Sequence, residues 1–234
     1  MKPAIKVLGV PDDINSSFMR GSSAAPPLIR EALYSASSNL FSESGLNLDQ
    51  KGIWEDLGDI EFAGEVAVEN FKKIKTFVKD VLVTDQKLVS LGGDHSVSWP
   101  ILDAHLDIWD ALDILHIDAH PDLYDSLLGN KLSHASPFAR IMETGRANRL
   151  VQVGIRTLNK HQREQAEKFG VEIYQMKDLT KLSSLSFSKP VYCSIDIDAL
   201  DPAYAPGVSH FEPGGLSTRQ LIDCLNGFKG RLIG

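Results

Sequence analysis

DILHIDAHPD, from Asp113 to Asp122, is the segment around which the rest of the chain is organised. It begins with a short apolar run that has the length and β-branched character of a buried strand: Ile114, Leu115 and Ile117. Three potential metal ligands then follow at alternate positions: Asp118, His120 and Asp122. Because alternate residues of an extended chain point to the same side, we expect these three side chains to converge on one point.

The rest of the chain alternates strand-like and helix-like segments. Strands are predicted at 5–10, 87–91, 150–155, 171–174 and 191–197, with a weaker one at 56–62 and the start of another at 231–234. Helices are predicted from Pro26, with Leu28, Ile29, Ala32 and Leu33 on an apolar face, and over 67–81, where apolar residues follow a 4-3-4-3 spacing. Further helices are predicted near Trp99, over 136–144 and 164–169, and after the Ser217–Gln220 capping box. This order predicts an α/β fold with a parallel sheet, a single domain over residues 1–234, and ligands at the carboxyl ends of the strands.

Two further strand ends carry polar residues of the same kind. One is Gly92-Gly93-Asp94-His95, whose glycines permit a tight turn that presents His95; taken alone, such a histidine is usually an ordinary loop residue. The other lies after Val191, where Asp196 and Asp198 end an apolar strand. Two like charges so close together are costly unless a positive charge lies between them. Asp201, before a proline, is interpreted as a turn residue.

Together the three strand ends supply two histidines and four aspartates. A donor set rich in hard oxygens with some nitrogen suits Mn²⁺, Mg²⁺ or Fe²⁺ better than structural zinc. Six ligands exceed what one catalytic ion needs, so the pattern favours two ions that share carboxylates, an arrangement typical of hydrolytic sites. The alternatives are a single non-catalytic ion and an acidic pocket without metal.

Composition bounds the remaining possibilities. The formal net charge of −7 over 234 residues, without a basic run, argues against a nucleic-acid surface. Cys193 and Cys224 give no disulfide framework, and Cys193 is expected to be a reduced core residue. The apolar part of MKPAIKVLGV is too short for a signal peptide, and no apolar run approaches a membrane span, so a cytoplasmic protein is expected.

From Val7 onward the chain resembles the ureohydrolases, the family of arginase, agmatinase and their relatives. The resemblance rests on four motifs in the family's order: GGDHS from Gly92, DAHPD from Asp118, SHASPFAR from Ser133, and SIDIDALDPAYAPG from Ser194. GNKLSHAS from Gly129 and VSHFEPGG from Val208 are most similar to the plant-type arginase branch.

The resemblance implies a three-layer α/β/α sandwich with a parallel sheet, two Mn²⁺ ions, and a metal-bridging hydroxide that attacks the guanidinium carbon of L-arginine to give urea and ornithine. It implies that His95, Asp118, Asp122 and Asp196 hold one ion, and that Asp118, His120, Asp196 and Asp198 hold the other. His134 matches the family's proton-shuttling histidine and is expected to be catalytic, together with Asp122. Asn130 is expected to line the substrate pocket. Glu212 is either a residue that orients a ligand or an ordinary acidic turn residue.

Two departures from the family pattern widen the range of functions. Asn159 lies where many arginases use an aspartate to bind the substrate's α-ammonium group. The family also continues beyond the strand begun at Arg231, with a glutamate that pairs with the guanidinium, so a C-terminally truncated chain is expected. The alternatives are therefore agmatinase, formiminoglutamase or another guanidino-acid hydrolase, and a metal-binding subunit without full activity. The family likeness implies a small-molecule guanidino substrate and a homo-oligomer, either a trimer or a hexamer.

Overall fold

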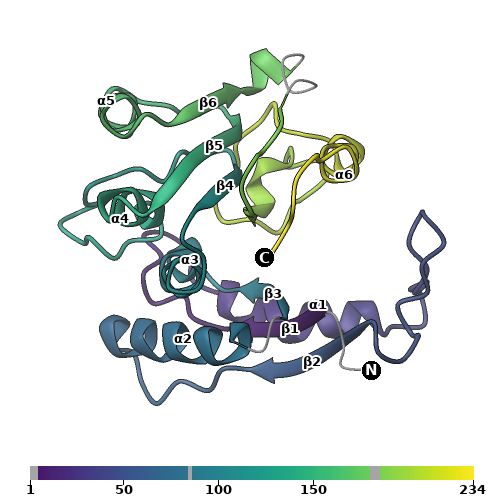
Figure 1. The fold of residues 1–234 in the computed structure, drawn as a ribbon. Coiled ribbons are helices and arrows are strands. Elements are labelled where there is room, and N and C mark those ends of the chain that lie inside the picture. The colour runs from purple at the N-terminus through teal and green to yellow at the C-terminus, as the bar shows by residue number, and fades with distance from the viewer. Residues whose placement is uncertain (1–4, 84–85, 180–184) are drawn as a thin grey trace. The chain divides into compact units, whose positions relative to one another are not determined.

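The computed structural model describes residues 5–83, 86–179 and 185–234, which form two compact units. The first unit contains residues 5–16, 20–83, 86–108 and 234, and the second contains residues 17–19, 109–179 and 185–233. Each unit has its own parallel sheet flanked by helices (Figure 1). The parallel-sheet α/β fold predicted from the sequence is confirmed.

In the first unit, the described residues form a sheet with the strand order β2-β1-β3. Its elements are β1 (Ile5–Val10), η1 (Ser22–Ala24), α1 (Ala25–Leu33), β2 (Trp54–Asp59), α2 (Ala67–Leu82), β3 (Lys87–Gly92), η2 (His95–Val97) and α3 (Ser98–Leu106). Helix α2 buries the face predicted from its 4-3-4-3 spacing, including Phe71, Ile74 and Val78, and it packs against α3.

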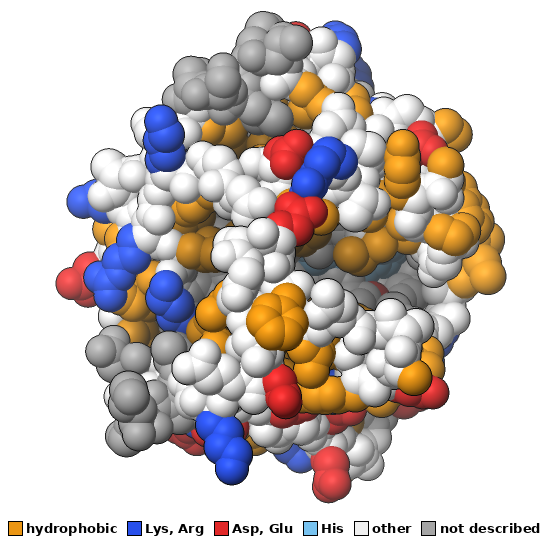
Figure 2. Space-filling model, turned by 90° about the vertical axis from the view of Figure 1, so that its right-hand side faces the viewer, with side chains coloured by type: hydrophobic (Ala, Val, Ile, Leu, Met, Phe, Trp, Pro, Cys, Tyr) orange, Lys and Arg blue, Asp and Glu red, His pale blue; other side chains and the backbone are white. Residues whose placement is uncertain are grey.

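Helix α1 begins as predicted, with proline in its first turn, but its apolar side chains are not buried. Leu28 is 57 % exposed and Ile29 is 46 % exposed, and only Pro26 of this helix is buried. Hydrophobic side chains also reach the surface at several separate places on the face drawn in Figure 2. The expected apolar stripe of α1 is therefore present in the sequence and unburied in the described chain.

In the second unit, the described residues form a sheet with the order β6-β5-β4-β7. Its elements are β4 (Leu112–Ile117), α4 (Pro137–Glu143), β5 (Ala147–Ile155), α5 (Lys160–Phe169), β6 (Glu172–Gln175), β7 (Val191–Ile195), η4 (Ile197–Ala199) and α6 (Thr218–Asn226). Strand β4 lies in the interior of this sheet and is buried at every position, which explains why four of its six residues are Leu or Ile and why they do not alternate with exposed polar residues.

The C-terminal segment pairs with the edge of this sheet. The Val191 amide donates to the Arg231 carbonyl (2.8 Å), and the Ile233 amide donates to the Val191 carbonyl (2.9 Å). The strand start predicted at 231–234 thus pairs with β7 in parallel. The capping box is also confirmed, since Ser217 and Gln220 exchange side-chain and backbone hydrogen bonds at the start of α6.

Residues 1–4, the first part of the N-terminal segment discussed above, lie outside the described residues. Among the helices that the structure describes, none combines the length and the apolar character needed to cross a membrane.

Candidate metal centre

The site in the second unit is built where β4 and β7 end side by side. In their parallel register Ile117 lies opposite Ile195, and the Asp196 amide donates to the Ile117 carbonyl (2.9 Å). The residues that follow the two strands, Asp118 and Asp196, therefore leave the sheet at the same level. This is the carboxyl edge at which parallel sheets bind ligands.

The segment after β4 bends, whereas the sequence analysis assumed an extended chain. The His120 amide donates to Asp118 Oδ1 (2.6 Å), which closes a turn over the first ligand pair. Asp122 has a φ of 51°, a left-handed conformation that aspartate tolerates better than most residues. The assumption of alternating side chains was wrong, and the bend brings the candidate ligands together instead.

Strand β7 ends earlier than predicted, at Ile195, so Asp198 lies on the 3₁₀ turn η4. Asp196 caps this turn by accepting a hydrogen bond from the Asp198 amide (2.9 Å). Asp198 Oδ1 in turn accepts the Ala119 amide (3.3 Å), which ties η4 to the segment after β4. Asp196 thus caps the turn, whereas Asp198 directs its buried carboxylate toward His120.

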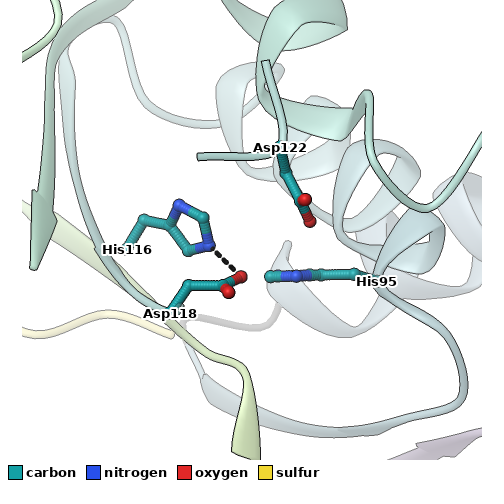
Figure 3. Close-up of side chains that lie close together, drawn as sticks. All are labelled: His95, His116, Asp118 and Asp122. Atoms are coloured by element: carbon teal, nitrogen blue, oxygen red, sulfur yellow. Dashed lines mark hydrogen bonds and ion pairs between the residues drawn. The ribbon is translucent and has the colours of Figure 1, made fainter. Parts of the chain in front are cut away.

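Two overlapping groups of donors result. The ligand atoms of Asp118, His120 and Asp198 all lie within 4.8 Å of one another, with His120 Nδ1 at 3.1 Å from Asp198 Oδ2 and 3.5 Å from Asp118 Oδ1. Those of His116, Asp118 and Asp122 satisfy the same limit (Figure 3). Asp118 belongs to both groups, as expected of a carboxylate shared between two ions.

The electrostatics of the first group favour bound positive charge. Burial, together with the neighbouring carboxylates Asp196 and Asp118, raises the pKa of Asp198 to about 8. Burial alone would lower the pKa of His120, but hydrogen bonds to Asp118 and Asp198 outweigh it and raise that pKa to about 11. Closely spaced, buried carboxylates are the environment in which a cation is stabilised.

Glu212 faces the far side of the same histidine. Its Oε1 lies 3.4 Å from His120 Nε2, so Nδ1 points to the aspartates while Nε2 points to Glu212. A carboxylate behind a ligating imidazole fixes the ring's orientation and tautomer. This contact favours the orienting role over the interpretation of Glu212 as an ordinary turn residue.

His134 lies outside these groups but close to them through a third histidine. Its ring stacks on His210 with 5.5 Å between centroids, and His210 meets His120 edge-on at 5.6 Å. The Ser17 hydroxyl lies 2.8 Å from His134 Nε2. Asn130 lies in an exposed turn, where its side-chain oxygen accepts the Leu132 amide (2.9 Å). His95 belongs to the first unit, in the turn η2 after β3.

Several residues at the site escaped the sequence analysis. His116 was passed over inside the apolar run, although a histidine in a buried strand is itself a signal because a buried polar ring needs partners. Arg156 was not assigned a role from the sequence, yet its guanidinium donates to the carbonyls of Asp198 (2.7 Å) and Glu212 (2.6 Å). It thereby holds the backbone of both loops that carry candidate site residues.

Comparison with known proteins decides the family. The family model for the arginase family matches residues 3–234. The chain belongs to the arginase family. Over its whole length it is 46 % identical to arginase 1, mitochondrial, of Oryza sativa, covering 73 % of that protein. It is 45 % identical to arginase 2, chloroplastic/mitochondrial, of Arabidopsis thaliana, covering 72 % of it. The solved arginase of Medicago truncatula superposes with a TM-score of 0.91 at 43 % identity, over 99 % of this chain and 77 % of that one.

Family membership makes this chain a ureohydrolase, a hydrolase that acts on linear amidine C–N bonds. The resemblance to plant-type arginases stated from the motifs is confirmed. The family is metal-dependent, and the His/Asp groups described above could hold a metal ion.

The cytoplasmic location expected from the N-terminal sequence is wrong by comparison with the relatives. The rice and Arabidopsis proteins are named mitochondrial or chloroplastic. The physical reason for the error is that import into these organelles depends on transit peptides, which differ from the secretory signal that the sequence analysis considered.

Proposed function

We propose that the protein is a manganese-dependent arginase that hydrolyses L-arginine to urea and ornithine. The observation that carries the proposal is the group of Asp118, His120 and Asp198, with both carboxylates buried, at the carboxyl ends of β4 and β7 in a chain 46 % identical to a plant arginase. Carboxylate oxygens with imidazole nitrogen form a hard donor set that suits Mn²⁺.

Six residues are proposed to hold two ions: His95, Asp118, His120, Asp122, Asp196 and Asp198. The donor set fits because three of its carboxylates, Asp118, Asp122 and Asp198, are buried and so need bound positive charge. His95 and Asp196 are included on the sequence motifs. When bound, the ions would supply an activated water and stabilise the negative charge that develops in the transition state.

Hydrolysis adds one water across the C–N bond of the guanidinium group, so a proton must reach the departing amine. We assign this transfer to His134 at Nε2, the atom that contacts the Ser17 hydroxyl. Asp122 is proposed to assist as a ligand and a hydrogen-bond acceptor, and Asn130 to line the pocket.

A second candidate function is the hydrolysis of agmatine, which lacks the α-carboxylate of arginine. The observation that keeps it a candidate is the state of Asn159. This residue caps α5, with its side-chain oxygen accepting the Gln162 amide (2.9 Å), and its amide nitrogen donates to the Tyr124 hydroxyl. Asn159 therefore offers no negative charge for binding an ammonium group, and because both arginine and agmatine carry one, this position does not select arginine over agmatine.

The deciding experiment measures urea release from L-arginine and from agmatine, in parallel, after loading the protein with Mn²⁺ and counting bound ions. Urea from arginine with two ions per chain supports the first proposal, and urea from agmatine alone supports the second. Bound ions without urea from either substrate contradict both and leave the metal-binding subunit. A chain that binds no Mn²⁺ contradicts the metal centre itself.

The homo-oligomer implied by family likeness stays a prediction. Light scattering of the purified protein gives its mass directly. A mass of one chain would contradict the trimer and the hexamer.

A further inference from the structure

His116 is a fully buried histidine inside the apolar strand β4, at 0 % exposure. Its Nε2 lies 2.7 Å from Oδ2 of Asp118, the carboxylate shared by both donor groups (Figure 3). A buried imidazole that contacts a ligating carboxylate either donates a proton to it or competes with it for the ion. The partner on the other ring nitrogen decides between these roles.

That partner is Gln152 on β5, which lies opposite His116 in the parallel register and is also at 0 % exposure. Gln152 Nε2 is 2.6 Å from the Pro121 carbonyl oxygen and 3.0 Å from His116 Nδ1. An amide oxygen could not face a carbonyl oxygen at 2.6 Å, so the amide must present its NH₂ group here. One hydrogen goes to Pro121 and the other to His116.

His116 Nδ1 is therefore an acceptor, and the ring's proton sits on Nε2, where it is donated to Asp118 Oδ2. The ring plane is held by Phe138 of α4, which stacks on it with 3.8 Å between centroids and is itself fully buried. The other carboxylate oxygen of Asp118 accepts the His120 amide. Both oxygens of this carboxylate are thus fixed by donors from the chain.

We propose that His116 and Gln152 are positioning residues that hold the Asp118 carboxylate in the orientation in which it binds metal. The inference rests on the proposed function, since it takes Asp118 to be a ligand. A neutral donor suits this task because it orients the carboxylate without placing a second positive charge beside the ion. Partners of this kind, behind a ligand, typically change metal affinity ~10–100-fold when removed.

The first test is independent of metal and of activity. Long-range ¹H–¹⁵N correlation NMR of the metal-free protein reports which nitrogen of His116 carries the proton. The expected result is a neutral ring with the proton on Nε2, the nitrogen that faces the Asp118 carboxylate. A proton on Nδ1 or a charged ring in the wild-type protein overturns the proposal.

The second test measures Mn²⁺ affinity by competition with a chelator in matched variants. His116→Phe keeps an aromatic ring against Phe138 but lacks the donor, whereas His116→Gln carries an NH₂ group the same number of bonds from the backbone as Nε2. The expected result is a ~10–100-fold loss of affinity in His116→Phe and Gln152→Met, with much of it restored in His116→Gln. His161→Phe on the half-exposed surface of α5 is the control and should bind as the wild type does.

Wild-type affinity in His116→Phe overturns the positioning role. Equal loss in His116→Phe and His116→Gln, with both variants folded by circular dichroism, also overturns it and makes His116 a direct ligand. Failure of the proposed function looks different: the wild-type protein would show the Nε2 tautomer and bind Mn²⁺ but release no urea from either substrate.

Discussion

At the scale of single residues, Asp198 combines burial with two acidic neighbours and a histidine 3.1 Å away. Asp198→Asn keeps the shape of the side chain and removes its charge, so we expect the protein to lose at least one of the two proposed ions and urea release to fall ~100-fold. Metal content after gel filtration and the initial rate measure this. Asp223→Asn on the exposed side of α6 is the matched control. Full metal content in Asp198→Asn would remove Asp198 from the ligand set.

His105 predicts how the stability of the protein depends on pH. Burial outweighs its hydrogen bond to the Ile101 carbonyl (2.9 Å) and lowers the pKa of His105 to about 4. In the unfolded chain this histidine has a pKa of about 6.5 and binds the proton more readily than in the folded chain. The free energy of unfolding therefore falls as the pH drops below about 6.5, and this decrease ends below about pH 4. Between about pH 7.5 and about pH 5, His105 should account for a loss of about 2 kcal/mol in the free energy of unfolding.

His105→Asn tests this, because asparagine can keep the hydrogen bond to Ile101 but carries no charge at either pH. Urea denaturation at the two pH values should show that the variant loses about 2 kcal/mol less than the wild type. His161→Asn, at a half-exposed position, should behave as the wild type. Equal losses in His105→Asn and the wild type would mean that His105 does not drive the acid sensitivity.

Residue identity could be predicted from the sequence more readily than residue geometry. Asp118, His120 and Asp198 were singled out from their place at strand ends, and the structure brings them together. The pairing of His116 with Gln152 could not be predicted, because it depends on the register between β4 and β5.

At the scale of elements, the turn after β3 depends on one glycine. A Cβ on Gly93 would lie 2.0 Å from the Asp12 carbonyl oxygen. This oxygen belongs to the backbone, so it cannot rotate away as a flexible side chain could. The Asp94 amide donates to that same carbonyl (2.9 Å), so the two segments must stay close. We expect Gly93→Ala to lower the free energy of unfolding by about 3 kcal/mol, the upper range for overpacking.

Denaturant midpoints of Gly93→Ala and Gly64→Ala measure this difference. Gly64 belongs to the same unit, and a Cβ there would meet no atom within 4 Å, so its replacement should change stability little. Similar midpoints for the two variants would show that the turn can shift without cost. The close approach of Gly93 to the Asp12 carbonyl would then not explain why glycine occupies this position.

Elements with a strong periodic pattern were predicted well, and element ends were not. The spacing of α2 and the capping box of α6 are local signals, and both were confirmed. Strand β7 was expected to reach Ile197, because its apolar alternation continues that far. It ends at Ile195, since Asp196 accepts a hydrogen bond from the Asp198 amide and begins a turn. Such competition between a side chain and the sheet is decided by neighbouring segments.

At the scale of the whole molecule, metal binding and domain organisation can be tested in one calorimetric experiment. An ion that binds only the folded chain stabilises it by about 2.7 kcal/mol at 100 times its Kd. For a chain of this size, that corresponds to a rise of about 5–10 °C in Tm. Mn²⁺ should produce this rise, EDTA should reverse it, and Asp198→Asn should reduce it.

The shape of the trace answers a separate question, because the described chain forms two compact units while a single domain was predicted from the sequence. One cooperative transition that moves as a whole supports the single domain. Two transitions, of which Mn²⁺ moves only one, contradict it, and loss of that shift in Asp198→Asn would assign the ions to the unit that carries Asp198. A trace that Mn²⁺ leaves unchanged contradicts the metal centre.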